Sequence, residues 1–499
     1  MPDTTKLEEY QKIDYIKIQT LLAERFNATR GELPPLNDIK ARRYFDNGDH
    51  WQLGNGFIGQ LPTGDAAEDR TEMLRRAFSP EDVISEVLDT HVQNVLGNDP
   101  TISIEGEDKT LEDVLTWFDK RDNTKVLGTA LRAARREQAS VLRAFIPSGM
   151  IDGEGRINAK DLAEALSKIW IRCEPIESGG VIVDDATATE LGLCLYRIRI
   201  GQADVSLAEY AYLDALGRTV WGTASAHTAK LGAEVAEPLK LGGMLPIYQM
   251  NARAMITDSV CQAQRDINLS GTMLTRNNNL AGSRERLAVG VQPPGEWVEQ
   301  GVDESGNKVM VFQPASMPTG PATFNFLQPE SIKDDSGNIT AYANPNIIFT
   351  DPVPIDTFIG TSEHWRRVIY AKAKMLHLLM SDNATASGKS RIEARKEFQS
   401  SLNESKQIVD AAGKWMISVA LNIAAHFIGK PGAFVESKVE FQADVSTIEL
   451  TSEENAEIRA DYESGMIDLR TALELRGIKN VEEILERISE QNRLEFETE

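Results

Sequence analysis

The sequence predicts an α+β fold that is predominantly helical, in which two β-rich regions interrupt long helices. Apolar residues recur at helical spacing over several stretches, and the longest runs from about Arg391 to Ile428. Between residues 169 and 225 the pattern changes to that of strands and hairpins. Residues 280–354 are rich in Gly, Pro and Asn and carry short turn-then-strand units. The 499 residues are enough for roughly two to four structural regions and a large core.

The first region, up to about residue 242, begins with helices and ends with strands. Residues 79–97 read as a helix with Ser79 as its N-cap, Pro80 at its first position and Gly97 after its end. Two further stretches with helical spacing lie within 110–145. Strand-like runs then follow as IWIRCEPI, GVIVDD, LCLYRIRIG and AEYAYLDALGRTVWGTAS, the last with a D-A-L-G turn. We therefore expect a helical layer and a β-subdomain here.

Long helices enclose the small β insertion. Apolar positions from Ile247 to Leu274 describe one face of a helix of about 28 residues, and residues 363–380 have the same spacing. In the third helix, 391–428, Gly413 is a candidate bend. Its apolar stripe is Phe398, Leu402, Val409, Ala412, Met416, Val419, Ile423 and Phe427. GKPG ends this helix, KVEFQADV reads as a strand, and short acidic helices follow, one of them capped by Asp468.

The loop SDNATASGKS, residues 381–390, nearly matches the phosphate-binding pattern G-x-x-x-x-G-K-[ST]. The first glycine of the pattern is replaced by Asn383, and the residues before the loop have helical spacing, whereas a phosphate loop follows a strand. We favour a connector between two helices. An ATPase that uses Lys389 and Ser390 remains the alternative.

Charge is distributed unevenly along the chain. The formal net charge is −23, which argues against a uniformly basic, nucleic-acid-coating surface. Residues 451–499 hold 14 acidic and 6 basic side chains, whereas 363–396 hold 8 basic and 3 acidic ones. The basic set flanks the SDNATASGKS loop, where contact with phosphate would add affinity through counterion release. Its members are Arg366, Arg367, Lys372, Lys374, Lys389, Arg391, Arg395 and Lys396.

Motifs for metal binding or catalysis are not indicated. Cys173, Cys194 and Cys261 form no C-x-x-C pair, and the 6 histidines include no H-x-x-x-H pair. Residues 150–161 resemble a calcium-binding loop but lack two oxygen ligands, which favours a turn before a helix. We expect no cofactor and no enzymatic activity. The N-terminus has no apolar run and the longest apolar stretch, 415–428, is too short to span a membrane, so a soluble protein is expected.

The order of these parts resembles the portal protein of tailed bacteriophages, of the siphophage head-to-tail connector type. Four segments carry the local resemblance: RRYFDNGDHWQLGNGFIG, HVQNVLGNDPTISI, SGKSRIEARKEFQSSL and DYESGMIDLRTALELRGIKNVEEILERI. The resemblance implies an α+β portal fold with a helical and β wing, two stem helices, a small β clip, a long kinked helix and a helical crown. The implied parts are the wing at 1–242, the stem helices at 243–279 and 355–381, the clip at 280–354, the tunnel loop at 382–390, the long wing helix with its following strand at 391–450, and the crown at 451–499.

The resemblance also implies a function. Portal subunits form a ring, of twelve in the virion, at one capsid vertex, through which a terminase motor packages double-stranded DNA and the genome later leaves. Expected partners are the terminase large subunit, head-completion adaptors, and capsid and scaffolding proteins, with no membrane. The chain would be made in the host cytoplasm. Residues expected to approach DNA in the tunnel loop are Asn383, Thr385, Ser387, Lys389 and Arg391, supported by Arg366, Arg367, Lys372, Lys374, Arg395 and Lys396.

Overall fold

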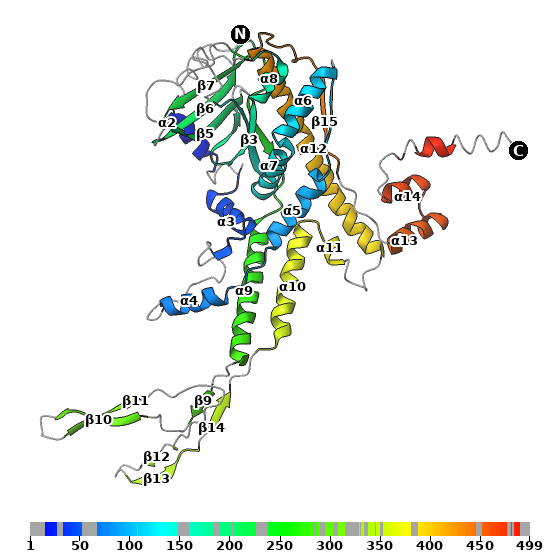
Figure 1. Ribbon diagram of the computed structural model, residues 1–499. Coiled ribbons are helices and arrows are strands. Elements are labelled where there is room, and N and C mark those ends of the chain that lie inside the picture. The colour runs from blue at the N-terminus through cyan, green and yellow to red at the C-terminus, as the bar shows by residue number, and fades with distance from the viewer. Residues whose placement is uncertain are drawn as a thin grey trace. The chain divides into compact units, whose positions relative to one another are not determined.

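The fold is α+β, with helices and several small sheets, as the sequence predicts (Figure 1). The chain forms two compact units. The larger consists of Met1–Phe57, Asp82–Arg265 and Trp365–Glu499, and the smaller of Ile58–Glu81 and Asp266–His364. The computed structural model describes residues 15–26, 33–51, 67–106, 108–147, 159–183, 190–200, 203–225, 238–282, 286–289, 295–302, 308–314, 329, 331–333, 338–344, 346–349, 353–380, 388–445, 452–476, 481 and 484–489.

The larger unit contains helices of very different lengths. They are α2 (Tyr15–Glu24), α3 (Leu36–Asp46), α5 (Val83–Leu96), α6 (Asp108–Lys120), α7 (Asn123–Glu137), α8 (Leu162–Ser167), α11 (His377–Met380), α12 (Gly388–Phe427), α13 (Ser452–Glu463) and α14 (Leu469–Leu475). Two more helices, α9 (Asp258–Gly282) and α10 (Ile355–Lys372), begin in one unit and end in the other.

The described strands of the larger unit form two sheets and one ribbon, all antiparallel. The three-stranded sheet has the order β3 (Trp170–Glu174), β2 (Ala139–Phe145), β8 (Ile247–Asn251). The four-stranded sheet has the order β4 (Gly179–Val183), β5 (Glu190–Ile200), β6 (Ala203–Leu213), β7 (Thr219–Ser225), and the ribbon pairs β1 (Thr101–Ile104) with β15 (Val439–Gln442). These strands cover the runs that the sequence predicts, and Asp214 caps the predicted turn by accepting the backbone N–H of Leu216 at 2.9 Å.

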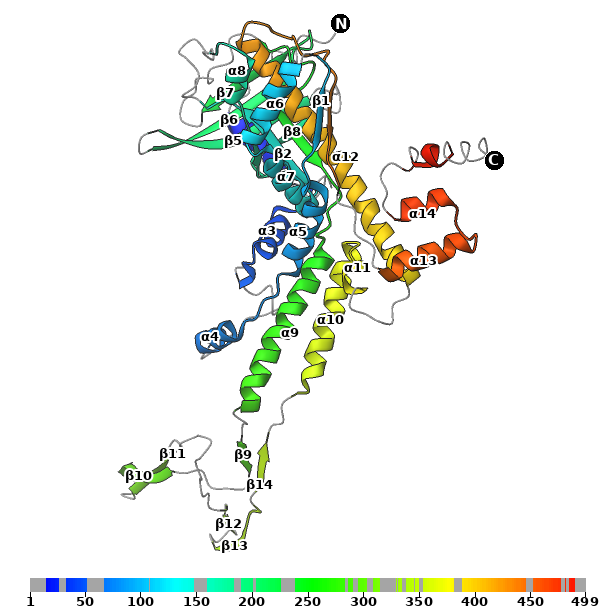
Figure 2. The same ribbon diagram turned by 45° about the vertical axis from the view of Figure 1, so that its right-hand side comes forward.

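Helix α12 is the centre of the core of the larger unit. It packs against α5, α7, α8 and β15, and both views show it running beside them (Figures 1 and 2). The predicted apolar stripe is buried over most of its length: Phe398, Leu402, Val409, Ala412, Met416, Val419 and Ile423 are all 0% exposed. Its last member, Phe427, is half-buried at the end of the helix. By length and composition alone, residues 394–427 could cross a membrane, but 72% of their most apolar window is buried inside the protein, as in a core helix.

The helix predicted to begin at Ile247 begins instead at Asp258, so this prediction is wrong for its first turns. Residues 247–251 form β8, whose backbone pairs with Ala139–Arg143 of β2. Ile247 and Met250 are buried at 1% exposure each, and their apolar character also fits a helical period. The pairing partner lies more than a hundred residues upstream, so local periodicity could not distinguish a strand from a helix.

Helix α5 also begins later than predicted, at Val83 rather than after Ser79. The backbone N–H groups of Ser79 and Glu81 have partners on α9, where Thr272 Oγ1 accepts at 3.5 Å and Asn268 Oδ1 accepts at 3.3 Å. Both acceptors are fully buried. Because side chains of a distant helix accept the hydrogen bonds of these backbone N–H groups, the segment does not need to be helical.

The helix predicted over 363–380 is divided in two. Helix α10 ends at Lys372, and Lys374 adopts a left-handed backbone with φ of 59°. The N–H of Met375 returns to the carbonyl of Tyr370 at 2.7 Å and that of Lys374 to Ala371 at 3.2 Å, which is a Schellman C-cap. The short helix α11 follows. A lysine therefore occupies the capping position that glycine usually takes.

The described strands of the smaller unit form separate antiparallel ribbons. They pair β9 (Arg286–Val289) with β14 (Asn346–Phe349), β10 (Gly295–Val302) with β11 (Lys308–Pro314), and β12 (Ser331–Lys333) with β13 (Ile339–Tyr342). The unit also contains α4 (Ala67–Ala77). The β9–β14 ribbon brings the two ends of the insertion together, with Val289 opposite Asn346. Beside it, the Asn277 side chain exchanges two hydrogen bonds with the backbone of Val353, at 2.8 and 2.9 Å.

Gly413 on α12 lies against the ring of Phe441, and a Cβ atom there would sit 2.5 Å from the ring. We expect Gly413→Ala to lower the free energy of unfolding by roughly 1–3 kcal/mol through overpacking, although alanine favours helices. Urea unfolding followed by circular dichroism would measure this change. The control is Gly360→Ala on α10, where no atom lies within 4 Å of the added Cβ. Equal stabilisation by both substitutions would contradict the prediction.

Candidate functional site

The predicted tunnel loop lies only partly within the described residues. Asn383, Thr385 and Ser387 fall in 381–387, outside them, so their predicted contacts with DNA stay predictions. Lys389 and Arg391 lie in the first turn of α12, which begins at Gly388. The segment that leads to the loop is α11, a helix, as the sequence argument against a phosphate loop requires.

The six supporting basic residues are distributed over α10, α12 and the turn after α10. Arg367, Lys372 and Lys396 are exposed, whereas Arg366, Lys374 and Arg395 are half-buried. Two of the half-buried guanidinium groups lie near titratable side chains: Arg395 near His377, and Arg366 near Tyr370. Burial and a hydrogen bond to Glu86 raise the pKa of Tyr370 above its usual range. The basic set is therefore partly exposed and partly built into the helix packing.

Three rings connect α11 with α12 and α5. The His377 and Phe398 ring centroids are 4.6 Å apart, and those of Phe398 and His91 are 6.1 Å apart. Burial and the neighbouring Arg395 lower the pKa of His377 to about 4. Burial and Arg135 lower the pKa of His91 to about 3. Both imidazoles are therefore neutral near pH 7, and they fix the helix that leads to the predicted loop.

Arg135 on α7 is the most deeply placed cation in this region, at 2% exposure. Its Nε and Nη2 atoms donate to Ser405 Oγ at 2.8 and 2.6 Å, and the same hydroxyl lies 2.6 Å from His91 Nε2. Nη1 donates to the carbonyl of Arg253 at 3.1 Å. Glu404, which is 43% exposed, lies 3.4 Å away. One guanidinium thus connects α7 with α12 and with the segment before α9.

A second charged cluster joins α3 to the end of α7. Asp46, at 4% exposure, accepts from Arg132 Nη2 at 2.5 Å and also from Arg136. Glu137 accepts two hydrogen bonds from Arg43, at 2.6 and 2.7 Å. The sequence interpretation missed both clusters. Their one local signal is the run RAARRE at 132–137, which places three arginines close together at the end of a helix.

Comparison with known proteins gives a weak likeness. No protein-family model matches the chain, and no curated protein matches it. Among solved structures, it is similar to a chain from the neck of an empty GTA particle computed with C6 symmetry, at 10% identity. The match covers 84% of this chain and 95% of that chain. The TM-score of 0.32 is too low to show a shared fold.

Among the described residues, no three His, Cys, Asp or Glu side chains are grouped so that they could hold a metal ion. The calcium-like segment at 150–161 lies mainly outside them. Its last residue, Asp161, caps α8 by accepting the N–H of Glu164 at 2.9 Å, as expected for a turn before a helix. Burial raises the pKa of Cys173 to about 12 and that of Cys261 to about 11, so these thiols are protonated at pH 7.

The lowered pKa of His91 predicts a pH-dependent stability. Between the unfolded pKa of about 6.5 and the folded value of about 3, the unfolded chain binds one more proton at this residue. Stability is therefore greatest above pH 6.5 and falls with pH below it, by about 1.4 kcal/mol per unit from this residue. We expect His91→Gln to remove this part of the slope in urea unfolding measured from pH 7 to pH 4.

The matched control for this experiment is Ser405→Ala. It removes the hydroxyl that lies against His91 and Arg135 but keeps the imidazole buried. We expect this variant to lose stability at every pH while keeping the slope of the wild type. A slope unchanged in His91→Gln would show that the imidazole does not take up a proton on unfolding.

Proposed function

We propose that the chain is a portal subunit: a non-enzymatic protein that forms a ring and conducts double-stranded DNA at one vertex of a phage or prophage capsid. The observation that carries the proposal is the order of elements. A helical and β-rich part is followed by α9, an inserted set of β ribbons, α10, a polar loop, the 40-residue helix α12 and short acidic helices. The proposal assigns these parts, in order, to the wing, stem, clip, stem, tunnel loop, long wing helix and crown of a portal subunit.

The charge distribution supports this function. A ring repeats the charge of each subunit, and a subunit of net charge −23 would give a channel whose wall repels phosphate. Cations limited to the narrowest part would make brief contacts, because each neutralised phosphate adds affinity through counterion release. Lys389, within the predicted tunnel loop, and Arg391, just after it, lie in the first turn of α12, where such contacts are needed. Terminase and head-completion adaptors would meet the clip at 280–354.

Ring formation is the first test. We expect electron microscopy of the purified chain to show closed rings whose central channel admits a DNA duplex. The ATPase alternative gives a different result: saturable ATP binding that is lost in Lys389→Ala, with monomers or small open oligomers in the images. Only open oligomers over a range of salt and protein concentrations would contradict the portal proposal.

Neutralising the loop cations tests their role. We expect Lys389→Ala with Arg391→Ala to leave rings intact and to weaken DNA retention. The slope of log K against log salt should fall by about 1 for each phosphate that is no longer neutralised. The control pair, Lys120→Ala with Lys125→Ala, removes the same charge from exposed sites on α6 and the start of α7. Loss of assembly in the loop variant would instead assign both residues to subunit contacts.

A further inference from the structure

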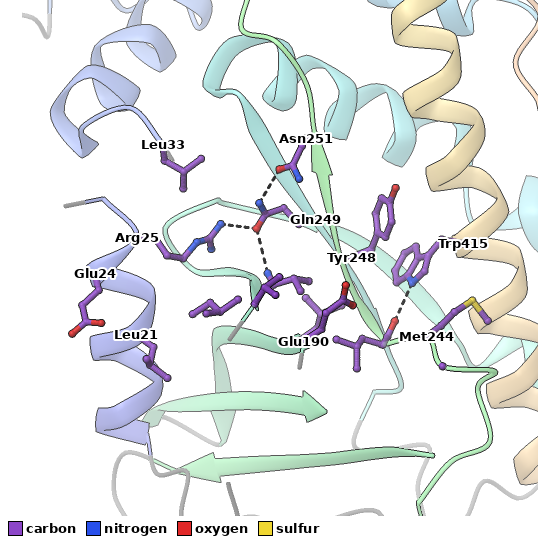
Figure 3. A pocket seen from close by; sticks show the side chains of 16 residues that line it. Leu21, Glu24, Arg25, Leu33, Glu190, Met244, Tyr248, Gln249, Asn251 and Trp415 are labelled. Carbon is purple, nitrogen blue, oxygen red and sulfur yellow. Dashed lines mark hydrogen bonds between the residues drawn. The ribbon is translucent and has the colours of Figure 1, made fainter. Parts of the chain in front are cut away.

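The larger unit contains a cavity of about 1000 Å³, bordered by α2, β4, β5, β8 and α12 (Figure 3). Val181, Ile182 and Val183 of β4 line it, as do Ile247, Tyr248 and Gln249 of β8. Successive residues of a strand point to opposite faces of its sheet. A cavity that touches three successive residues of each strand must therefore run along the strand edges, and both strands are the outermost of their sheets.

The edge of β8 has free backbone groups. At the two ends of its ladder with β2, the N–H of Ala252 donates to Gln138 at 2.9 Å and that of Ala144 to Pro246 at 2.8 Å. Antiparallel partners alternate between bonded and non-bonded pairs. The N–H and C=O groups of Ile247, Gln249 and Asn251 therefore face away from β2, toward the cavity. Within the described residues, these backbone groups have no hydrogen-bond partner.

The edge of β4 is already occupied by side chains. Arg25 Nη1 donates to the carbonyl of Gly179 at 2.5 Å, and the N–H of Val181 donates to Gln249 Oε1 at 3.2 Å. Arg25 Nη2 also donates to Gln249 Oε1, at 2.6 Å, and Figure 3 shows these side chains converging. Of the two edges that border the cavity, β8 is the one whose outward-facing backbone groups have no hydrogen-bond partner within the described residues.

The other walls of the cavity define what a bound strand would carry. Leu33, Ile182 and Met244 offer apolar contacts, and Tyr248 stacks on Trp415 with ring centroids 5.1 Å apart. Two carboxylates, Glu24 and Glu190, also line the cavity and have no ion pair within the described part of the chain. A segment with alternating apolar side chains and with lysine or arginine side chains would complement both the apolar walls and the two carboxylates.

We propose that this cavity binds an extended peptide segment of a partner protein. The segment adds to β8 as a fourth strand of the β3–β2–β8 sheet, places apolar side chains against the cavity walls, and directs basic side chains toward Glu24 and Glu190. Backbone pairing supplies the affinity and the alternate side chains supply the selectivity. This inference does not depend on the portal function.

The test uses the full-length chain and a fluorescein-labelled peptide, TVKVTVKVT, in anisotropy titrations. We expect saturable binding by the wild type and at least tenfold weaker binding by Asn251→Pro. The proline removes one outward-facing N–H and no bond of the ladder with β2. The same peptide with every backbone amide N-methylated should bind at least tenfold more weakly, because neither of its edges can donate hydrogen bonds to β8. Equal binding of the two peptides would overturn the proposal.

Charge reversal at Glu24 and Glu190 gives a second test of peptide affinity, and we do not expect it to unfold the protein. Glu24→Lys with Glu190→Lys should weaken binding of TVKVTVKVT at least tenfold and strengthen that of TVEVTVEVT. The control pair, Glu112→Lys with Asp119→Lys, makes the same change at exposed sites on α6 and should leave both affinities unchanged. Hydrogen exchange at residue resolution should show Ile247 and Gln249 amides protected only with peptide. The proposal would be overturned if the peptide showed no saturable binding, or if Asn251→Pro and the double charge reversal both left its affinity unchanged.

Discussion

The packing of the larger unit depends on one buried cation. Arg135 is charged at any pH that the protein meets, and a guanidinium deprived of water must find acceptors or destabilise the fold. It finds them on Ser405 and Ser401 of α12, and on the carbonyl of Arg253. Each acceptor lies on a different turn or segment, so the helices can pack in only one arrangement that satisfies all of them. The small side chains of Ser401 and Ser405 also allow the guanidinium to approach α12 closely.

The consequences of this contact extend to neighbouring groups. Ser405 serves both Arg135 and His91, so α5 is fixed by the same hydroxyl. His91 in turn contacts Phe398, and Phe398 contacts His377 of α11. The start of α12 and the helix before the predicted tunnel loop are therefore positioned by a continuous set of contacts from α7. The contact with DNA that we propose for this loop would need fixed supports on both sides, and this set of contacts provides them.

Local sequence patterns were sufficient to predict those helices, strands and caps that do not depend on one particular distant residue. The stripe along α12, the β5–β6–β7 meander and the Asp468 cap, which accepts the N–H of Thr471 at 2.7 Å, were predicted from the residues themselves. The errors at β8 and at the start of α5 arose where distant groups satisfy the backbone: β2 for Ile247–Asn251, and Asn268 and Thr272 for the segment after α4. The basic site was predicted from charge spacing alone. The partial burial of Arg366 and Arg395 could not be predicted in this way. Burial depends on which helices lie nearby, and no local motif specifies that.

The β9–β14 ribbon fixes the place where the inserted residues leave and rejoin the rest of the chain. Because Val289 and Asn346 face each other across it, the residues between them leave and return at one place, while Asn277 fixes Val353 just before α10. Segments closed at their base in this way tolerate changes in length and sequence. Homologues could therefore exchange the whole stretch between Val289 and Asn346 for an unrelated one while α9 and α10 stay as they are. Recombination would then replace this inserted stretch without altering the helices on either side of it in the sequence.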